Sequence, residues 1–229
     1  MESMIDPKLP LIDLHHHLDG SLRLQTILEL GLQHNLPLPA KTIEELRPYV
    51  QVSTPQPGVM QFIEKFKWMT GVLVDYDACR RVAYENVEDA VKEGLDYIEL
   101  RYSPWFMAQA HALNPVGIIE AVTEGVKHGE LDFHIRANQV GILSRHYGPE
   151  IAHKELNALL AHRNYFCGLD LAGDEAHFPG NLFVEHFKLA REAGWHVTVH
   201  AGEADGPASV WQAMRDLGAE RIGHAVRAP

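Results

Sequence analysis

Three consecutive histidines, His15, His16 and His17, stand inside the apolar run LIDLHHHLDG near the start of the sequence. The run has the residue types of a β-strand, and successive side chains of a strand point to opposite faces. His15 and His17 are therefore expected on one face and His16 on the other. An H-x-H pair on one face offers two imidazole nitrogens to a single metal ion, and imidazole suits zinc, iron, nickel or copper. The alternative is chance, because the chain holds 15 histidines.

Three further stretches place polar residues just after a strand-like run. TVHAGEADGP carries His200 and Glu203, RIGHAV carries His224, and DLAGDE surrounds Gly173 with three carboxylates. Taken alone, each stretch is explained by a satisfied boundary histidine or a solvated loop. Taken together with the H-x-H pair, they indicate metal-assisted hydrolysis. Zinc with an open coordination position lowers the pKa of its water toward ~7, and a nearby glutamate can shuttle the proton.

Strand-like and helix-like stretches alternate along the chain, which is typical of a parallel sheet covered by helices. The expected strands are Leu11–Leu18, Asp96–Ser103, Phe133–Leu143, Phe166–Gly173, His196–Gly202 and Arg221–Val226. The expected helices are Leu22–Asn35, Ala78–Gly94, Pro115–Gly129, Asn181–Gly194 and Pro207–Gly218. The long stretch between the first two strands, Leu22 to Gly94, is expected to hold about four helical segments and to form a lid or an elaborated first loop.

The fold class follows from where the polar residues stand. A (β/α)₈ barrel and an open doubly wound sheet both fit the alternation, but the clustering at the carboxyl ends of strands is where a barrel places its chemistry. The sequence contains no GxGxxG or P-loop motif after a strand, which disfavours Rossmann-type nucleotide binding. We expect one α/β domain over residues 1–229, of the (β/α)₈ barrel type with about six βα units.

Composition limits the possible partners. The net charge of −11, without a Lys/Arg-rich block, disfavours nucleic acid and anionic membranes and suits a small neutral or cationic ligand or a metal cation. Two cysteines, no signal segment and no apolar run of ~18 residues predict a cytoplasmic protein. Structural roles are expected for the histidines without a ligand pattern: His34, His111, His128, His146, His153, His162, His177 and His186.

The motifs HHHLDGS, DLAGDE, TVHAGE and RIGH, in this order, resemble those of the adenosine deaminases of the amidohydrolase superfamily. The stretches LRLQTILELG and YIELRYSP add to the similarity, which runs from Leu9 to Arg227. The resemblance implies a zinc-containing (β/α)₈ barrel with one Zn²⁺ per chain. It also implies hydrolysis of adenosine, and often of 2′-deoxyadenosine, to inosine and ammonia, with a purine nucleoside as the small-molecule partner.

The resemblance also implies roles for the residues of these motifs. His15, His17 and His200 match the zinc ligands. Glu203 matches the proton donor to purine N1, and burial would have to raise its pKa for it to carry a proton at pH 7. His224 matches the histidine that orients the zinc-bound water and helps to deprotonate it.

The same resemblance places the substrate. Gly173 matches the glycine whose N–H contacts purine N3, and His17 and Asp19 match residues that meet the ribose 5′-hydroxyl. Adenine-acting relatives tend to carry HLEG where this chain has HLDG, so Asp19 favours a nucleoside over the free base. An apolar wall over the purine is expected from four residues of the long stretch between the first two strands, although their spacing also suits a core-facing helix: Phe62, Phe66, Trp68 and Met69.

Two departures from the family pattern bear on activity. Ala225 follows His224 where the family usually has glycine, and an added methyl there could shift the histidine. The sequence also ends after the sixth expected strand, so the aspartate pair of the family's eighth strand is missing. We expect a piece of a longer active enzyme, and weak zinc binding with poor adenosine turnover for these 229 residues alone.

Other readings stay open at this point. One is a deaminase of a related aminopurine such as adenine or aminofutalosine. Another is a non-catalytic, incomplete barrel that binds a nucleoside or a protein partner. The sequence leaves the oligomeric state undecided.

Overall fold

The computed structural model describes residues 9–54 and 58–228, and its sheet consists of six parallel strands. Each strand pairs with the next one in the chain, so the spatial order equals the sequence order. The strands are β1 (Ile12–His17), β2 (Tyr97–Tyr102), β3 (Arg136–Ser144), β4 (Phe166–Ala172), β5 (His196–Ala201) and β6 (Arg221–His224). All six expected strands are present. The third begins three residues later than expected, because the preceding helix continues to Phe133.

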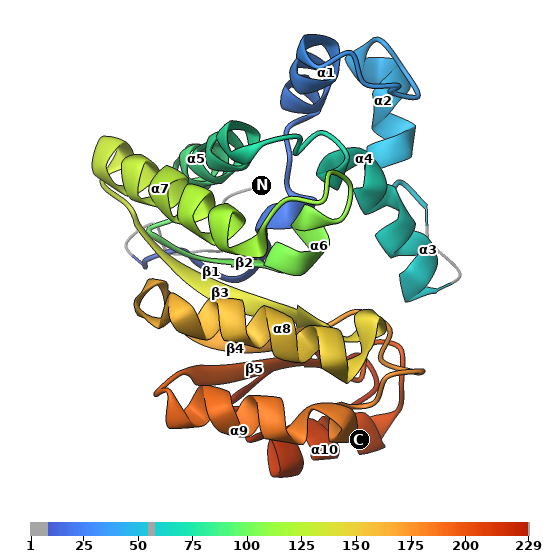
Figure 1. Cartoon of the computed structure of the whole chain (residues 1–229), viewed down its shortest axis with the longest axis vertical. Coiled ribbons are helices and arrows are strands. Elements are labelled where there is room, and N and C mark those ends of the chain that lie inside the picture. Colours follow the sequence, from blue (N-terminus) through green and yellow to red (C-terminus); the bar gives the residue numbers. More distant parts are fainter. Residues whose placement is uncertain (1–8, 55–57, 229) are drawn as a thin grey trace.

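Helices follow the strands and cover the sheet (Figure 1). After β2 come the short α6 (Pro104–Ala108) and the long α7 (Pro115–Phe133); later units supply α8 (Gly148–Ala161), α9 (Val184–Glu192) and α10 (Pro207–Gln212). Helix α7 packs along α5 (Tyr76–Lys92), while α8 and α9 pack on β3 and β5. Buried apolar side chains of the strands and of these helices form one core.

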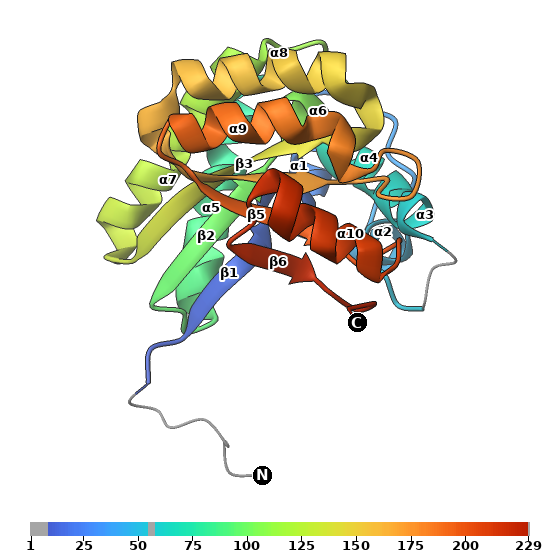
Figure 2. The same ribbon diagram turned by 90° about the horizontal axis from the view of Figure 1, so that it is seen from below.

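Strands β1 and β6 do not pair, but they approach each other at their carboxyl ends (Figure 2). A Cβ atom added to Gly223 on β6 would lie only 2.7 Å from Cε1 of His15 on β1. The sheet is therefore curved into most of a barrel, and the expected (β/α)₈ type with six units is confirmed. The curvature brings the polar ends of β1, β5 and β6 to one place.

Helices α6 and α8 lie outside the set that the sequence analysis predicted. Helix α8 begins at Gly148-Pro149, residues that also read as a turn, and its apolar stripe is short. Only Ala152, Leu156 and Leu159 bury apolar side chains, together with the carboxylate of Glu155. Such a short stripe gives a weak periodic signal, so the helix is stabilised by packing on β3 more than by its own pattern.

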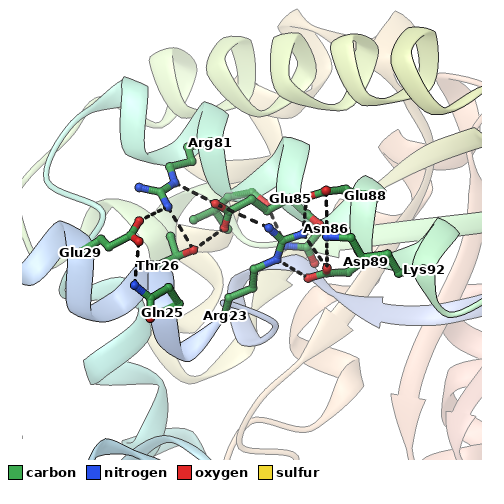
Figure 3. Close-up of polar contacts among 11 residues, drawn as sticks. Arg23, Gln25, Thr26, Glu29, Arg81, Glu85, Asn86, Glu88, Asp89 and Lys92 are labelled. Carbon is green, nitrogen blue, oxygen red and sulfur yellow. Dashed lines mark hydrogen bonds and ion pairs between the residues drawn. The ribbon is translucent and has the colours of Figure 1, made fainter. Parts of the chain in front are cut away.

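The segment between β1 and α5 holds four helices, namely α1 (Leu24–Gln33), α2 (Ile43–Val50), α3 (Val59–Ile63) and α4 (Lys67–Thr70). Arg23, at the start of α1, attaches this segment to α5 (Figure 3). Its guanidinium donates to both carboxylate oxygens of Asp89, at 2.5 and 2.7 Å, and to Glu88 at 2.5 Å. This bidentate geometry is the strongest form of ion pair between side chains.

No helix of the described residues is long and apolar enough to cross a membrane.

Candidate active site

Three imidazole rings meet at the carboxyl ends of β1 and β5. The Nε2 atom of His200 lies 3.1 Å from that of His15 and 3.1 Å from that of His17, and the latter two are 3.3 Å apart. Nitrogen ligands at about 2.0–2.1 Å from a tetrahedral zinc ion are separated by about 3.3–3.4 Å. The three nitrogens therefore fit the ligand set of one metal ion, with a fourth position left for another group.

His16 takes no part in this cluster. Its Nδ1 atom lies 3.1 Å from Oδ2 of Asp13, and its Nε2 atom lies 3.1 Å from Oδ1 of Asn86 on α5. The ring therefore faces the covering helix, as the alternation of the strand predicts. The three histidines separate into a ligand pair and one outward-facing residue.

A buried ion pair orients His200 from behind. Asp170 on β4 accepts a hydrogen bond from Nδ1 of His200 at 3.0 Å and lies 2.6 Å from the guanidinium of Arg101. Burial opposes ionisation of Asp170, but the charges of His200 and Arg101 hold the pKa of its carboxyl far below the usual range. Arg101 also donates to the carbonyl of Leu14 on β1. The pair thus fixes the ring of His200 with Nε2 directed at the other two histidines.

The surroundings of His15 favour its neutral imidazole. Burial, the charge of Arg101 and the neighbouring rings of His200 and His17 lower the pKa of His15 to about 3. A neutral ring nitrogen keeps the lone pair that a metal requires. The electrostatics of the site therefore agree with the spacing of the nitrogens.

Glu203 and His224 stand beside the histidine cluster. Oε1 of Glu203 lies 3.7 Å from Nε2 of His224, and the His224 ring centroid lies 4.9 Å from those of both His15 and His200. Burial lowers the pKa of His224, although the charge of Glu203 opposes this effect. His224 and Ala225 both have positive φ, +67° and +52°, so the chain turns sharply at this point. The family glycine at position 225 would adopt this conformation at lower cost.

A cavity of about 390 Å³ opens in front of the cluster, and all seven candidate site residues line it. Asp19 is buried and accepts a hydrogen bond from the N–H of Ser103 at 3.1 Å. Gly173 has a φ of +110°, and a Cβ atom there would lie 2.6 Å from Nδ1 of His146. This position therefore requires glycine for two reasons, its backbone conformation and the close imidazole.

The apolar wall of the cavity differs from the expected one. Phe62 and Phe66 line the cavity, but Trp68 and Met69 do not. Met69 is buried with 3% of its surface exposed, and Trp68 packs edge-on against Tyr49. The expectation for these last two residues was wrong, because Met69 packs into the core and Trp68 packs against the core and against Tyr49 of α2.

The structure adds residues to the site to which the sequence analysis gave no individual role, although it expected Arg101–Ser103 among the polar residues at strand ends. His146 lines the cavity, although a structural role was expected for it, and Ser103 and Phe106 do so from the start of α6. Arg101 also belongs to this group through its ion pair. Its signal in the sequence was the recurrence of polar residues at every second position of YIELRYS, an otherwise apolar strand.

Sequence comparison agrees with this geometry. The profile of the adenosine deaminase family matches residues 10–229. An adenosine deaminase from Shigella boydii serotype 18 is 57% identical over 225 residues, which cover 98% of this chain and 68% of that protein. The chain belongs to the adenosine deaminase family. An adenosine deaminase from Klebsiella pneumoniae gives the same identity and coverage.

Solved structures of the same superfamily share the fold. Adenine deaminase from Arthrobacter aurescens matches with a TM-score of 0.83 at 25% identity, over 95% of this chain and 65% of that one. A zinc-bound amidohydrolase from Burkholderia ambifaria matches with a TM-score of 0.84 at 25% identity, over 95% and 59%. The N6-methyl-AMP deaminase from Arabidopsis thaliana reaches 0.75 at 27% identity, over 95% and 64%. The chain thus spans less than two thirds of the length of each of these three proteins, two of which are named as deaminases of a base and of a nucleotide.

Proposed function

We propose that this chain catalyses a zinc-dependent hydrolytic deamination, which converts adenosine to inosine and 2′-deoxyadenosine to deoxyinosine and releases ammonia. One observation carries the proposal. Three imidazole nitrogens at zinc-ligand spacing face the same cavity as Glu203 and His224. Membership of the adenosine deaminase family supports the choice of reaction. We also propose that the six βα units act as one domain, which the unbroken order of the sheet supports.

His15, His17 and His200 would hold the metal. Their nitrogen-only donor set and its spacing suit zinc, and the neighbouring zinc-bound amidohydrolase supports this choice. Bound zinc would supply Lewis-acid activation of the attacking water. Asp170 would keep His200 in the required orientation through the hydrogen bond to Nδ1.

The other residues would act on the purine and on protons. Water adds to C6 of adenine, the exocyclic nitrogen leaves as ammonia, and charge develops at ring N1. Glu203 would give a proton to N1, and His224 would accept the proton that the attacking water loses and return it to the departing amino group, which leaves as ammonia. The 3.7 Å distance between Oε1 of Glu203 and Nε2 of His224 supports these paired roles.

Nucleoside recognition would come from further residues that line the same cavity. The N–H of Gly173 would donate to purine N3, while His17 and Asp19 would meet the ribose 5′-hydroxyl. The phenyl rings of Phe62 and Phe66 would cover the purine face. The carboxylate of Asp19 also disfavours a 5′-phosphate at the same place, because two anions would repel each other.

Zinc content and product formation together test the proposal. The purified 229-residue chain is loaded with zinc, its metal content is measured by mass spectrometry, and inosine is measured by chromatography. We expect zinc in the unmodified chain and none in His200→Ala. His16→Gln is the matched control from the same triplet and should keep its zinc, because His16 faces α5.

Glu203→Gln should retain zinc but form inosine at least about 100-fold more slowly, which is the usual contribution of a general acid. Adenine, AMP and adenosine are offered in parallel. Faster turnover of adenine or AMP would overturn the nucleoside assignment. Zinc binding without turnover of any of them, both by these 229 residues and by a version extended through the family's eighth strand, would overturn the deaminase function in favour of a nucleoside-binding role.

A further inference from the structure

Glu175, the last residue of the DLAGDE motif, is almost fully buried, with 2% of its surface exposed. Its carboxylate does not face the cavity of the proposed active site. It points instead into the loop that follows β5, which contains Glu203. The loop that brings Gly173 to the cavity therefore also carries a carboxylate to the neighbouring βα unit.

Four consecutive backbone N–H groups converge on this one carboxylate. Oε1 accepts from Gly202 at 2.7 Å, and Oε2 accepts from Glu203, Ala204 and Asp205 at 3.1, 2.7 and 3.0 Å. The hydroxyl of Ser209, in the first turn of α10, donates to Oε1 as well. Successive N–H groups of this kind form a concave anion site, which is filled here by a side chain of the same protein.

The other side of the loop is held too. The backbone N–H of Arg227 donates to the carbonyl of Gly202 at 2.9 Å, and its guanidinium donates to the carbonyl of Ala204 at 3.0 Å. Gly202 itself has a φ of +67°, which starts the turn. With N–H groups fixed on one side and carbonyls on the other, the peptide planes on both sides of Glu203 have little freedom.

We propose that Glu175 is a positioning residue whose carboxylate holds the 202–205 loop so that the side chain of Glu203 enters the cavity. The proposal rests on the proposed function, because it takes Glu203 as the proton donor. The carboxylate is needed in its ionised form, since it serves only as an acceptor for five donors. Burial opposes ionisation, but the hydrogen bonds from Ser209 and the loop keep the pKa of Glu175 below its usual range.

Amide hydrogen exchange tests the holding of the loop without any need for catalysis. In Glu175→Gln an amide group replaces one acceptor oxygen and turns a donor toward the N–H groups. We expect exchange of the 202–205 amides to rise about 10–100-fold, the usual strength of hydrogen bonds to a charged acceptor, while the strands exchange as before. Unchanged exchange in this loop, or an equal rise over the whole chain, would overturn the proposal.

Two further variants sharpen this measurement. Ser209→Ala removes only one donor, so it should raise exchange in the same loop by less than Glu175→Gln, and it keeps the test decisive if Glu175→Gln fails to fold. Asp174→Asn is the matched control, because the carboxylate of Asp174 bonds only to the nearby His177 among the described residues. It should leave exchange of the 202–205 amides unchanged.

Steady-state kinetics test the positioning of Glu203. Glu175→Gln should lower kcat for adenosine by at least about tenfold and change KM by less than about threefold, since the donor and not the nucleoside contacts is displaced. Faster loop exchange with an unchanged kcat would overturn the positioning role. Absence of inosine formation by the unmodified chain would instead overturn the proposed function, and the exchange experiment would still decide whether Glu175 holds the loop.

Discussion

The guanidinium of Arg101 on β2 and the carboxylate of Asp170 on β4 form an ion pair of 2.6 Å in which neither side chain has more than 1% of its surface exposed. Strand β3 lies between the two strands, so the pair spans the barrel interior. Asp170 also accepts a hydrogen bond from Nδ1 of His200. The buried ion pair therefore holds His200 in the histidine cluster and is also part of the core.

Replacing Asp170 by asparagine should weaken both functions. The orienting hydrogen bond to His200 loses its charge, and zinc affinity should fall about 10–100-fold. Arg101 is left as an unpaired buried charge, so the free energy of unfolding should fall by about 3–5 kcal/mol. Chelator competition and denaturant titration measure the two effects. Asp174→Asn serves as the control, and equal zinc affinities for the two variants would contradict the role of Asp170.

Gly173→Ala tests the backbone conformation that brings the N–H of this residue to the cavity. At a φ of +110°, and with Nδ1 of His146 only 2.6 Å from the new Cβ atom, alanine forces the loop or the imidazole to move. We expect a loss of about 1–3 kcal/mol in the free energy of unfolding and weaker nucleoside binding. Calorimetry of both processes checks this.

Gly206→Ala is the matched control for this substitution. Gly206 has a φ of −85° and open space where the Cβ atom would stand. The free energy of unfolding of Gly206→Ala should fall by less than about 1 kcal/mol, since the only cost is that alanine is a poorer N-cap than glycine. Similar losses in the two variants would show that the conformation at position 173 is not special.

Most of the fold could be predicted from the amino-acid sequence, because the patterns that specify strands lie within short stretches of the chain. Six apolar runs bounded by turn residues became six strands. Alternation along one strand separated His16 from His15 and His17, and the contact of His16 with Asn86 agrees with that separation. Strand ends that share one edge of a parallel sheet then had to bring His200 near the pair.

Long-range partners could not be predicted in the same way. Glu175 meets an N–H group 27 positions away, and nothing in DLAGDE distinguishes an acceptor for a neighbouring loop from a solvated carboxylate. Trp68 and Met69 are large apolar residues like Phe62 and Phe66, and only the tertiary packing of this segment decides which of them face the cavity. Helix α8 was not predicted because its apolar stripe is weak. This helix depends on tertiary contacts with β3, which the sequence pattern does not show.

Ala225→Gly should stabilise the chain. Ala225 has a φ of +52°, a left-handed conformation that costs an L-residue roughly 1–2 kcal/mol. Glycine removes this cost, but its greater freedom in the unfolded chain offsets about half of the gain in folding free energy. We expect a gain of about 0.5–1 kcal/mol in the free energy of unfolding by urea titration. Ala193→Gly should show a loss instead, because Ala193 has an ordinary φ of −77°. A loss in both variants would contradict the strain assigned to Ala225.

Glu155 on α8 gives the protein a specific pH dependence. Its carboxylate accepts from Ser103 Oγ at 2.6 Å and from the N–H groups of Trp105 and Ser144, so it joins the ends of β2 and β3. Burial raises the pKa of Glu155 from 4.5 to about 7 against these hydrogen bonds, and the nearby charge of Asp19 adds to the rise. In the unfolded chain the carboxyl ionises near pH 4.5. Rising pH therefore favours the unfolded chain between pH 4.5 and about 7.

At about 1.4 kcal/mol for each pH unit in this window, the contribution of Glu155 to stability should fall by about 3 kcal/mol. Glu155→Gln cannot titrate, so the difference in free energy of unfolding between the unmodified chain and this variant should shrink by that amount as the pH rises. His15, with a pKa lowered to about 3 by burial, gives an opposite slope. That slope is common to both proteins and cancels in the difference. Denaturant titrations from pH 4.5 to 8 measure this difference in free energy of unfolding between the two proteins. A difference that stays constant with pH would show that Glu155 is already ionised in the folded protein.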